Sequence, residues 1–260
     1  MDRAGIAAAF DAYVRGYDAE NPMIRLKIEH TWRVAAISER IAGSLSVSTD
    51  LAWLLGVLHD IGRFEQARRY GTFLDGRSVN HAEFGADLLF REGLIDRFPA
   101  DGLPENWREA AETAIRLHNR LALPEDLDPA TRTLSQVLRD ADKVDIFRVS
   151  TEFSQTDRIG AGAALEASDV LSPGVLDCVM GHRCVPRGVR RNALDIQASH
   201  ACMAFELVYP ESRDIARAQG WLVRLLSPAA GDSAARREQL ALVRREIEAA
   251  WGMPLAGESC

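Results

Sequence analysis

The chain has 260 residues, of which 47% are hydrophobic and 27% charged, a composition typical of a globular protein with enough apolar side chains for a core. Its formal net charge of −7 argues against a general nucleic-acid-binding surface, because such a surface neutralises phosphates with an excess of Lys and Arg. No apolar run approaches the roughly 20 residues that a membrane-spanning helix needs, and the N-terminus does not resemble a signal peptide. Four cysteines without CxxC spacing favour a reducing compartment, so we expect a cytoplasmic protein without membrane attachment.

Apolar residues recur at helical spacing along most of the chain, and no hairpin signal is flanked by alternating strands. The predicted fold class is therefore all-α. Because no internal repeat is visible, one all-helical domain over residues 1–260 is the simplest organisation. We expect helices at residues 2–18, from 22 to about 41, and at 53–62, 80–93, 105–120, 131–147, 195–209, 210–226 and 234–251.

The segment Trp53–Gly62 is apolar on every side, which predicts a helix buried in the core. His59 and Asp60 lie in its last turn, and Gly62 is the expected stop signal. A carboxylate is unfavourable at the C-terminal end of a buried helix, where the backbone carries partial negative charge, and a bound cation would stabilise it. The polar, glycine-containing stretch 63–76 is expected to be a loop or a broken helix, and either a lid or wall of a substrate site or an ordinary connection.

Four histidines lie at the ends or on the apolar stripes of different predicted helices: His30, His59, His81 and His118. In the helix at 131–147, Asp142 stands at a position that can face the core, whereas Asp140 and Asp145 fit an exposed face. Helical bundles often build metal sites from inward-facing side chains of this kind. Imidazole and carboxylate ligands without thiolates suit a divalent transition metal such as Mn, Fe, Co, Ni or Zn.

The ordered set of His30, His59-Asp60 and Asp142 resembles the H…HD…D signature of the HD-domain metal-dependent phosphohydrolase superfamily, over roughly residues 20–150. The resemblance implies a helical bundle in which these four residues hold one metal ion. His81 and His118 stand where some members bind a second ion, so one or two ions per chain are expected. Asn119 departs from the second histidine often found there. Asp140 competes with Asp142 for the last ligand position, but the small residue before Asp142 and the basic one after it match the family pattern.

The resemblance implies hydrolysis of a phosphomonoester or phosphodiester of a nucleotide-like small molecule by metal-activated water. Asp60 would bridge two ions. Cationic side chains near the signature are candidates for binding the substrate phosphate, with surface ion pairs as the alternative: Arg33, Arg63, Arg68 and Lys143. Arg33 and Lys143 are also candidate catalytic residues, and Glu65 is a candidate general acid or base.

Two other interpretations remain open. The first is a non-catalytic module that uses the same pocket to sense a metal or nucleotide, although an intact ligand signature favours catalysis. The second is a structural zinc site in the C-terminal part, although its spacing matches no zinc-finger pattern: Cys178, His182, Cys184, His200 and Cys202. Residues 151–260 are expected to be a helical extension of unknown role, which could form a homodimer surface or cap the pocket.

Overall fold

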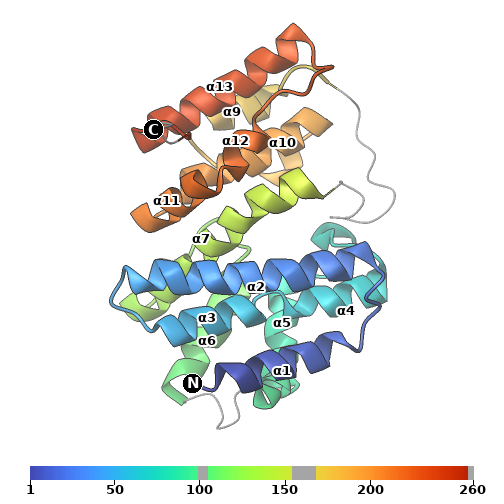
Figure 1. The fold of residues 1–260 in the computed structure, drawn as a ribbon, viewed down its shortest axis with the longest axis vertical. Helices are drawn as coiled ribbons and strands as arrows, with labels where there is room; N and C mark the ends of the chain where they lie inside the picture. The colour runs from blue at the N-terminus through green and yellow to red at the C-terminus, as the bar shows by residue number, and fades with distance from the viewer. Residues whose placement is uncertain (99–104, 154–167, 257–260) are drawn as a thin grey trace. The chain divides into compact units, whose positions relative to one another are not determined.

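The computed structural model describes residues 1–98, 105–153 and 168–256. It contains helices and no β-strand within these ranges, so the predicted all-α fold is confirmed (Figure 1). None of the described helices combines the length and the apolar character needed to cross a membrane. By backbone packing the chain divides into two compact units, with Met1–Asp142 in the first. The expectation of one domain over residues 1–260 stays a prediction.

The first unit is a bundle whose largest interface lies between α2 and α3. The helix α4 packs against α2, α6 packs against α3, and α5 packs against α4 and α6. Asn21 caps α2 and Ser48 caps α3, because their side chains accept hydrogen bonds from the first-turn amides of Met23 and Leu51. The helices of this unit are α1 (Arg3–Val14), α2 (Pro22–Gly43), α3 (Thr49–Leu58), α4 (Ile61–Tyr70), α5 (His81–Ala86), α6 (Glu105–Leu117) and the start of α7 (Pro129–Glu152).

The expected helix stop at Gly62 is wrong. The helix α3 ends at Leu58, and after a turn at His59 and Asp60 the chain enters α4, which contains Gly62. A Cβ atom on Gly62 would lie 2.5 Å from the carbonyl oxygen of His81 and 2.7 Å from the amide nitrogen of Gly85. Glycine is therefore required here for the close packing of α4 against α5, and not for a turn.

Of the two alternatives for residues 63–76, the broken helix is correct, because α4 extends to Tyr70 and ends there. Gly71 ends that helix with a φ of 61°, a left-handed conformation that glycine adopts without strain. The following segment leads through a short 3₁₀ turn at Asp75–Arg77 to Asn80, whose side chain caps α5. After α5 the backbone continues as a π-helical turn over Asp87–Arg91 and a 3₁₀ turn over Leu94–Arg97.

The second unit comprises residues 143–153 and 168–256 of the described chain. A helix over residues 173–180 was not predicted, and the predicted helix at 210–226 is interrupted at Gly220, which has a φ of 69°. Trp251 anchors the last helix, because its indole N–H donates to the carbonyl of Ala204. The helices are the end of α7, α9 (Pro173–Met180), α10 (Ala193–Ala201), α11 (Pro210–Gln219), α12 (Trp221–Leu225) and α13 (Ala234–Trp251).

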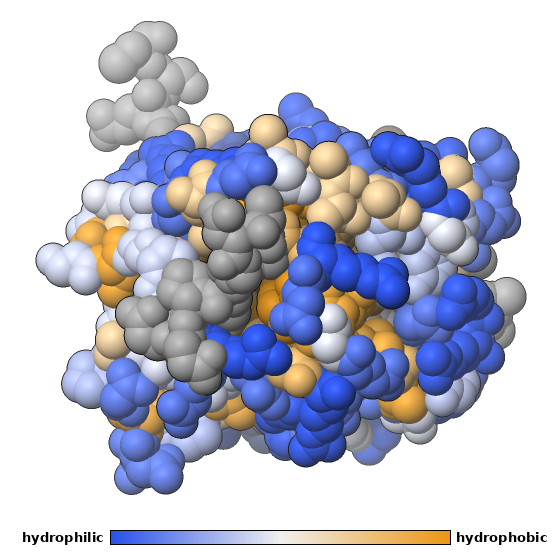
Figure 2. Space-filling view, turned by 90° about the horizontal axis from the view of Figure 1, so that it is seen from below, coloured by the Kyte–Doolittle hydropathy of each residue, from blue (hydrophilic) through white to orange (hydrophobic). Residues whose placement is uncertain are grey.

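The surface is dominated by hydrophilic residues, as amphipathic helices around an apolar core require. Figure 2 shows this for the face on which α1 lies, where hydrophobic areas are interspersed among polar side chains. Few large apolar side chains are exposed in the described part of the first unit, among them Tyr70 and Leu121. The buried polar residues, which are unusual for a core, are therefore the candidates for function.

Candidate metal centre

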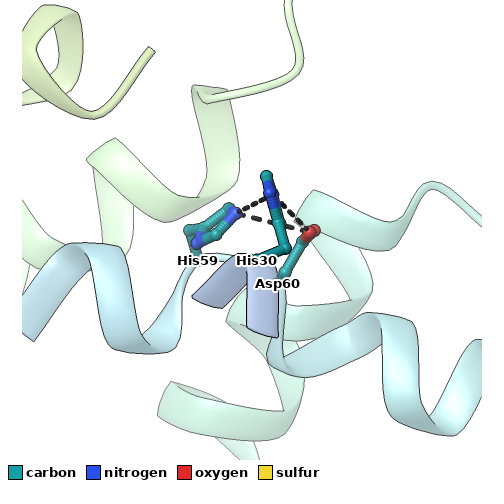
Figure 3. A group of neighbouring side chains, drawn as sticks. All are labelled: His30, His59 and Asp60. Carbon is teal, nitrogen blue, oxygen red and sulfur yellow. Dashed lines mark hydrogen bonds and ion pairs between the residues drawn. The ribbon is translucent and has the colours of Figure 1, made fainter. Parts of the chain in front are cut away.

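Two histidines and an aspartate meet where α2 approaches the end of α3 (Figure 3). The Nε2 atoms of His30 and His59 are 3.3 Å apart, and Asp60 Oδ2 lies 3.5 and 3.3 Å from them, respectively. All three side chains are almost completely buried. Asp142 joins them from α7, with its Oδ1 atom 3.1 Å from His30 Nε2 and 3.8 Å from His59 Nε2. We call these four residues the first group.

A second group shares Asp60 with the first. Its other carboxylate oxygen, Oδ1, lies 3.5 Å from His81 Nε2 and 3.8 Å from His118 Nε2, and these two nitrogens are 3.1 Å apart. His81 is the first residue of α5, and His118 directly follows α6. The single carboxylate of Asp60 thus offers one oxygen to each group, which is the arrangement of a ligand that bridges two ions.

The surroundings of Asp60 explain how a carboxylate is tolerated in the core. Asp60 is the N-cap residue of α4 and not the last residue of α3, but its side chain accepts no capping hydrogen bond. The expectation that it lies only at an unfavourable C-terminal end is therefore corrected. Burial raises the pKa of Asp60, but Lys27, His59 and His81 outweigh burial and hold this pKa well below its ordinary value of 3.8.

The histidines of the second group are held in one tautomer. His118 Nδ1 lies 2.7 Å from the carbonyl oxygen of Ile115, and His81 Nδ1 lies 2.8 Å from Asp75 Oδ2. A carbonyl and an ionised carboxylate only accept hydrogen bonds, so both Nδ1 atoms carry the proton. Burial lowers the pKa of His81 to about 4, helped by Arg63, and lowers that of His118 to about 3, helped by His81 and His59. Both rings are therefore neutral near pH 7.

Neutral rings with protonated Nδ1 atoms leave two Nε2 lone pairs facing each other at 3.1 Å. Neither Nε2 atom carries a proton that could form a hydrogen bond to the other. The contact is therefore repulsive unless a cation lies between these lone pairs and Asp60. His59 has the same tautomer, because its Nδ1 atom lies 2.8 Å from the carbonyl oxygen of Gly56. These donor atoms fit a divalent transition metal. Both the set of His30, His59 and Asp60 and the set of Asp60, His81 and His118 could hold an ion.

Asp75 and Arg63 support the second group, and the role of Asp75 was not predicted. The Arg63 guanidinium donates to the carbonyl of Phe73 at 2.8 Å and to Asp75 at 3.0 Å, and its Nε atom lies 3.6 Å from Asp60 Oδ1. Burial raises the pKa of Asp75, but His81 and Arg63 hold it below its ordinary value. Nothing in the local sequence distinguished Asp75 from other loop carboxylates.

Arg139 and Asn119 hold the backbone on either side of His118 in place. Arg139 is buried and donates to backbone carbonyls at the end of α6 and just after it, including those of His118 and Leu121. Asn119 donates to Asn80 Oδ1 at 2.8 Å, and its own buried amide oxygen has no hydrogen-bond partner among the described residues. Both residues fix the backbone beside His118, which places its imidazole.

Lys27 contacts the first group and was not predicted from the sequence. Its ammonium donates to Asp60 Oδ2, the oxygen that faces His30 and His59. The i, i+3 spacing of Lys27 and His30 puts both on one face of α2, and this spacing could have identified it. Of the two competing aspartates, Asp142 is the one whose carboxylate lies beside His30, whereas the carboxylate of Asp140 accepts a hydrogen bond from Gln136 at 2.8 Å. The expectation that Asp140 and Asp145 lie on an exposed face is wrong, because both are buried.

The remaining predicted residues have other partners. Arg33 pairs with Glu29 at 3.5 Å, and Arg68 pairs with Glu65 and lies over the Tyr17 ring. Burial raises the pKa of Glu65, but hydrogen bonds from Tyr17, Arg68 and Arg69 hold it below its ordinary value of 4.5, so Glu65 is ionised and unsuited to donate a proton.

Lys143 follows Asp142 in the chain but belongs to the second unit, where its Nζ atom lies 3.2 Å from Glu206 Oε2. In the same unit His182 pairs with Glu246 at 2.9 Å. Within the described ranges, the C-terminal cysteines and histidines do not form a group able to hold a metal, so nothing in these ranges supports the zinc interpretation.

The comparisons with known proteins agree with this geometry. Residues 28–146 match the family model of the HD domain. This part of the chain is therefore similar to an HD domain. The matched range covers all six residues of the two groups, and the resemblance seen in the sequence is confirmed. Neither the curated proteins nor the solved structures include a match to the chain.

Proposed function

We propose that this protein is a metal-dependent phosphohydrolase that cleaves a phosphomonoester or phosphodiester of a nucleotide-like small molecule. The observation that carries the proposal is that the first and second groups of candidate metal ligands share the Asp60 carboxylate. The proposal rests also on the HD domain at residues 28–146, whose superfamily includes metal-dependent phosphohydrolases. The proposed ligands are His30, His59, Asp60 and Asp142 for one ion, and Asp60, His81 and His118 for the other.

Divalent ions in these groups would lower the pKa of a water molecule toward neutrality and polarise a phosphoryl oxygen. The chain's own residues then have three tasks. The Nδ1 hydrogen bonds of His59, His81 and His118 aim each Nε2 lone pair inward. Burial keeps these imidazoles in a dry environment, which strengthens electrostatic interactions. Arg63 adds positive charge beside Asp60 Oδ1.

The cationic side chains differ in how well their surroundings suit phosphate binding. Arg63 is held by three acceptors, Gln66, Phe73 and Asp75, so it fits a fixed positive charge better than a residue that moves onto a substrate. Arg33, Arg68 and Lys143 remain proposed phosphate contacts, although each has a carboxylate partner. The small-molecule ester as substrate and the native metal, among Mn, Fe, Co, Ni and Zn, are parts of the same proposal.

The test is elemental analysis combined with a substrate panel. Wild-type protein loaded with Mn²⁺ is expected to hold one or two ions per chain and to hydrolyse a member of a panel of nucleoside monophosphates, cyclic nucleotides and dinucleotides. Asp60→Asn keeps the shape of the shared ligand but removes its charge, so we expect loss of bound metal and a fall in kcat of at least about 100-fold.

Asp140→Asn is the matched control, because it changes another fully buried carboxylate of the same unit; metal content and activity should persist. A wild-type protein that holds no metal would refute the proposal. A protein that binds metal and nucleotide without turnover would establish the sensing module in its place.

A further inference from the structure

The Lys27 ammonium occupies the place of a cation in the first group. It donates to Asp60 Oδ2, the same oxygen that lies 3.5 Å from His30 Nε2 and 3.3 Å from His59 Nε2. A divalent ion held by these donors would compete with Lys27 for this oxygen. It would also repel the ammonium, since two positive charges close together repel each other strongly where water screens them poorly.

Lys27 has fewer anchors than the other cation beside Asp60. Its described contacts are the ion pair with Asp60 and the face of the Phe73 ring, 5.7 Å from Nζ to the ring centroid. The Arg63 guanidinium lies over the same ring at 5.2 Å but also has three hydrogen-bond acceptors. Lys27 is therefore the cation that can leave Asp60, and its flexible four-carbon stem lets the ammonium move while the helix stays in place.

The charge balance determines when an anion can bind. Among the carboxylates, lysine and arginine joined by these contacts, three carboxylates (Asp60, Asp75 and Asp142) oppose two cations (Lys27 and Arg63). The metal-free cluster is thus negative and disfavours a phosphate. One divalent ion reverses the sign of this balance, and at the same time frees the ammonium of Lys27.

We propose that Lys27 is a phosphate-binding residue that becomes available only when a divalent ion takes its place on Asp60. Metal and substrate then bind in a fixed order, and the protein without metal does not hold phosphate. This inference rests on the proposed function, because it takes the phosphate ester as the ligand.

The experiment measures two affinities, without turnover, on chelator-treated protein. Mn²⁺ binding is followed through the signal of free Mn²⁺ in electron paramagnetic resonance, and inorganic phosphate binding by calorimetry with and without Mn²⁺. Wild-type protein is expected to bind phosphate only with Mn²⁺ present. Lys27→Met removes the charge and keeps the stem, so Mn²⁺ should bind about tenfold more tightly, and phosphate about tenfold more weakly, than in wild type.

Two variants complete the design. Lys27→Arg restores a cation and should restore phosphate binding to within about threefold of wild type. Arg3→Met is the matched control, because Arg3 also pairs with a carboxylate, Asp50, and lies over an aromatic ring, that of Trp53. Neither affinity should change in this control.

The outcomes separate the two proposals. Unchanged phosphate affinity in Lys27→Met, or Mn²⁺ affinity that is unchanged or weaker, would overturn the inference, because Lys27 would then only support Asp60. A wild-type protein that binds no Mn²⁺ would instead overturn the proposed function. Circular dichroism and thermal unfolding of each variant establish that it folds.

Discussion

At the scale of single residues, the candidate centre depends on which atom of each histidine carries its proton. His81 and His118 present Nε2 lone pairs because Asp75 and the carbonyl of Ile115 accept their Nδ1 protons. Such outer contacts orient a ligand and raise its basicity. Asp75 is thus as much a part of the second group as the histidine it contacts, although it would not touch the metal.

Replacing Asp75 tests this dependence. Asp75→Asn keeps the size of the side chain but removes the charge that fixes the His81 tautomer, so we expect the second ion to bind about 10- to 100-fold more weakly. The first ion should be less affected, because Asp75 accepts hydrogen bonds from His81 of the second group and from Arg63. Mn²⁺ titration would show the number of tightly bound ions falling from two to one.

Asp50→Asn is the comparison for Asp75→Asn, since Asp50 is a carboxylate of the same unit whose pKa is also held low, by Arg3. It should leave both ions in place. Two ions bound with wild-type affinity in Asp75→Asn would show that the second group does not need this carboxylate.

At the scale of elements, two close contacts between helices bring the ligands together. Gly56 lets α3 approach α2, since a Cβ atom there would lie 2.4 Å from the Cα atom of Ala35. Gly62 does the same for α4 and α5 at the carbonyl of His81. The first contact brings His59 near His30, and the second brings His81 near Asp60.

Gly62→Ala is expected to force α4 and α5 apart. Because backbone atoms cannot yield as a flexible side chain would, the added methyl group should lower the free energy of unfolding by about 1–3 kcal/mol. Urea unfolding of metal-free protein measures this loss. The control is Gly43→Ala, which also changes a helical glycine but has no atom within 4 Å of the new Cβ; this variant should be as stable as wild type or slightly more stable. Equal stability of the two variants would contradict the packing argument.

At the scale of the whole molecule, the buried titratable groups make folding sensitive to acid. The pKa of His81 is lowered to about 4 and that of His118 to about 3 by burial, whereas both are near 6.5 in the unfolded chain. Between these values the unfolded chain binds more protons than the folded one, so the stability falls as the pH decreases. Below about pH 4, Asp60, Asp75 and Asp142 add to the loss, because their pKa values are also lowered on folding.

We therefore expect metal-free protein to have its full stability above about pH 6.5 and to lose on the order of 3 kcal/mol per histidine by pH 4. Urea unfolding between pH 8 and pH 4 measures this loss. His118→Gln removes one of the two groups and should give a shallower dependence over the same range. A wild-type stability that is constant from pH 7 to pH 4.5 would show that these histidines are not buried in the neutral form.

The sequence by itself determined the helical class, since helical periodicity is a local property of the chain. Through the resemblance to the HD domain it also predicted the ordered ligand set, with Asp142 preferred over Asp140. It predicted most helices but misplaced the boundary at Gly62, because a glycine needed for close packing and a glycine that ends a helix look alike in sequence. Only the tertiary structure showed that Asp60 is shared by two groups, that Asp75 fixes His81 and that Lys27 pairs with Asp60. The last of these contacts joins residues 33 positions apart. The spacing of Lys27 and His30 places both on one face of a helix, but the pairing of Lys27 with Asp60 depends on how the helices pack.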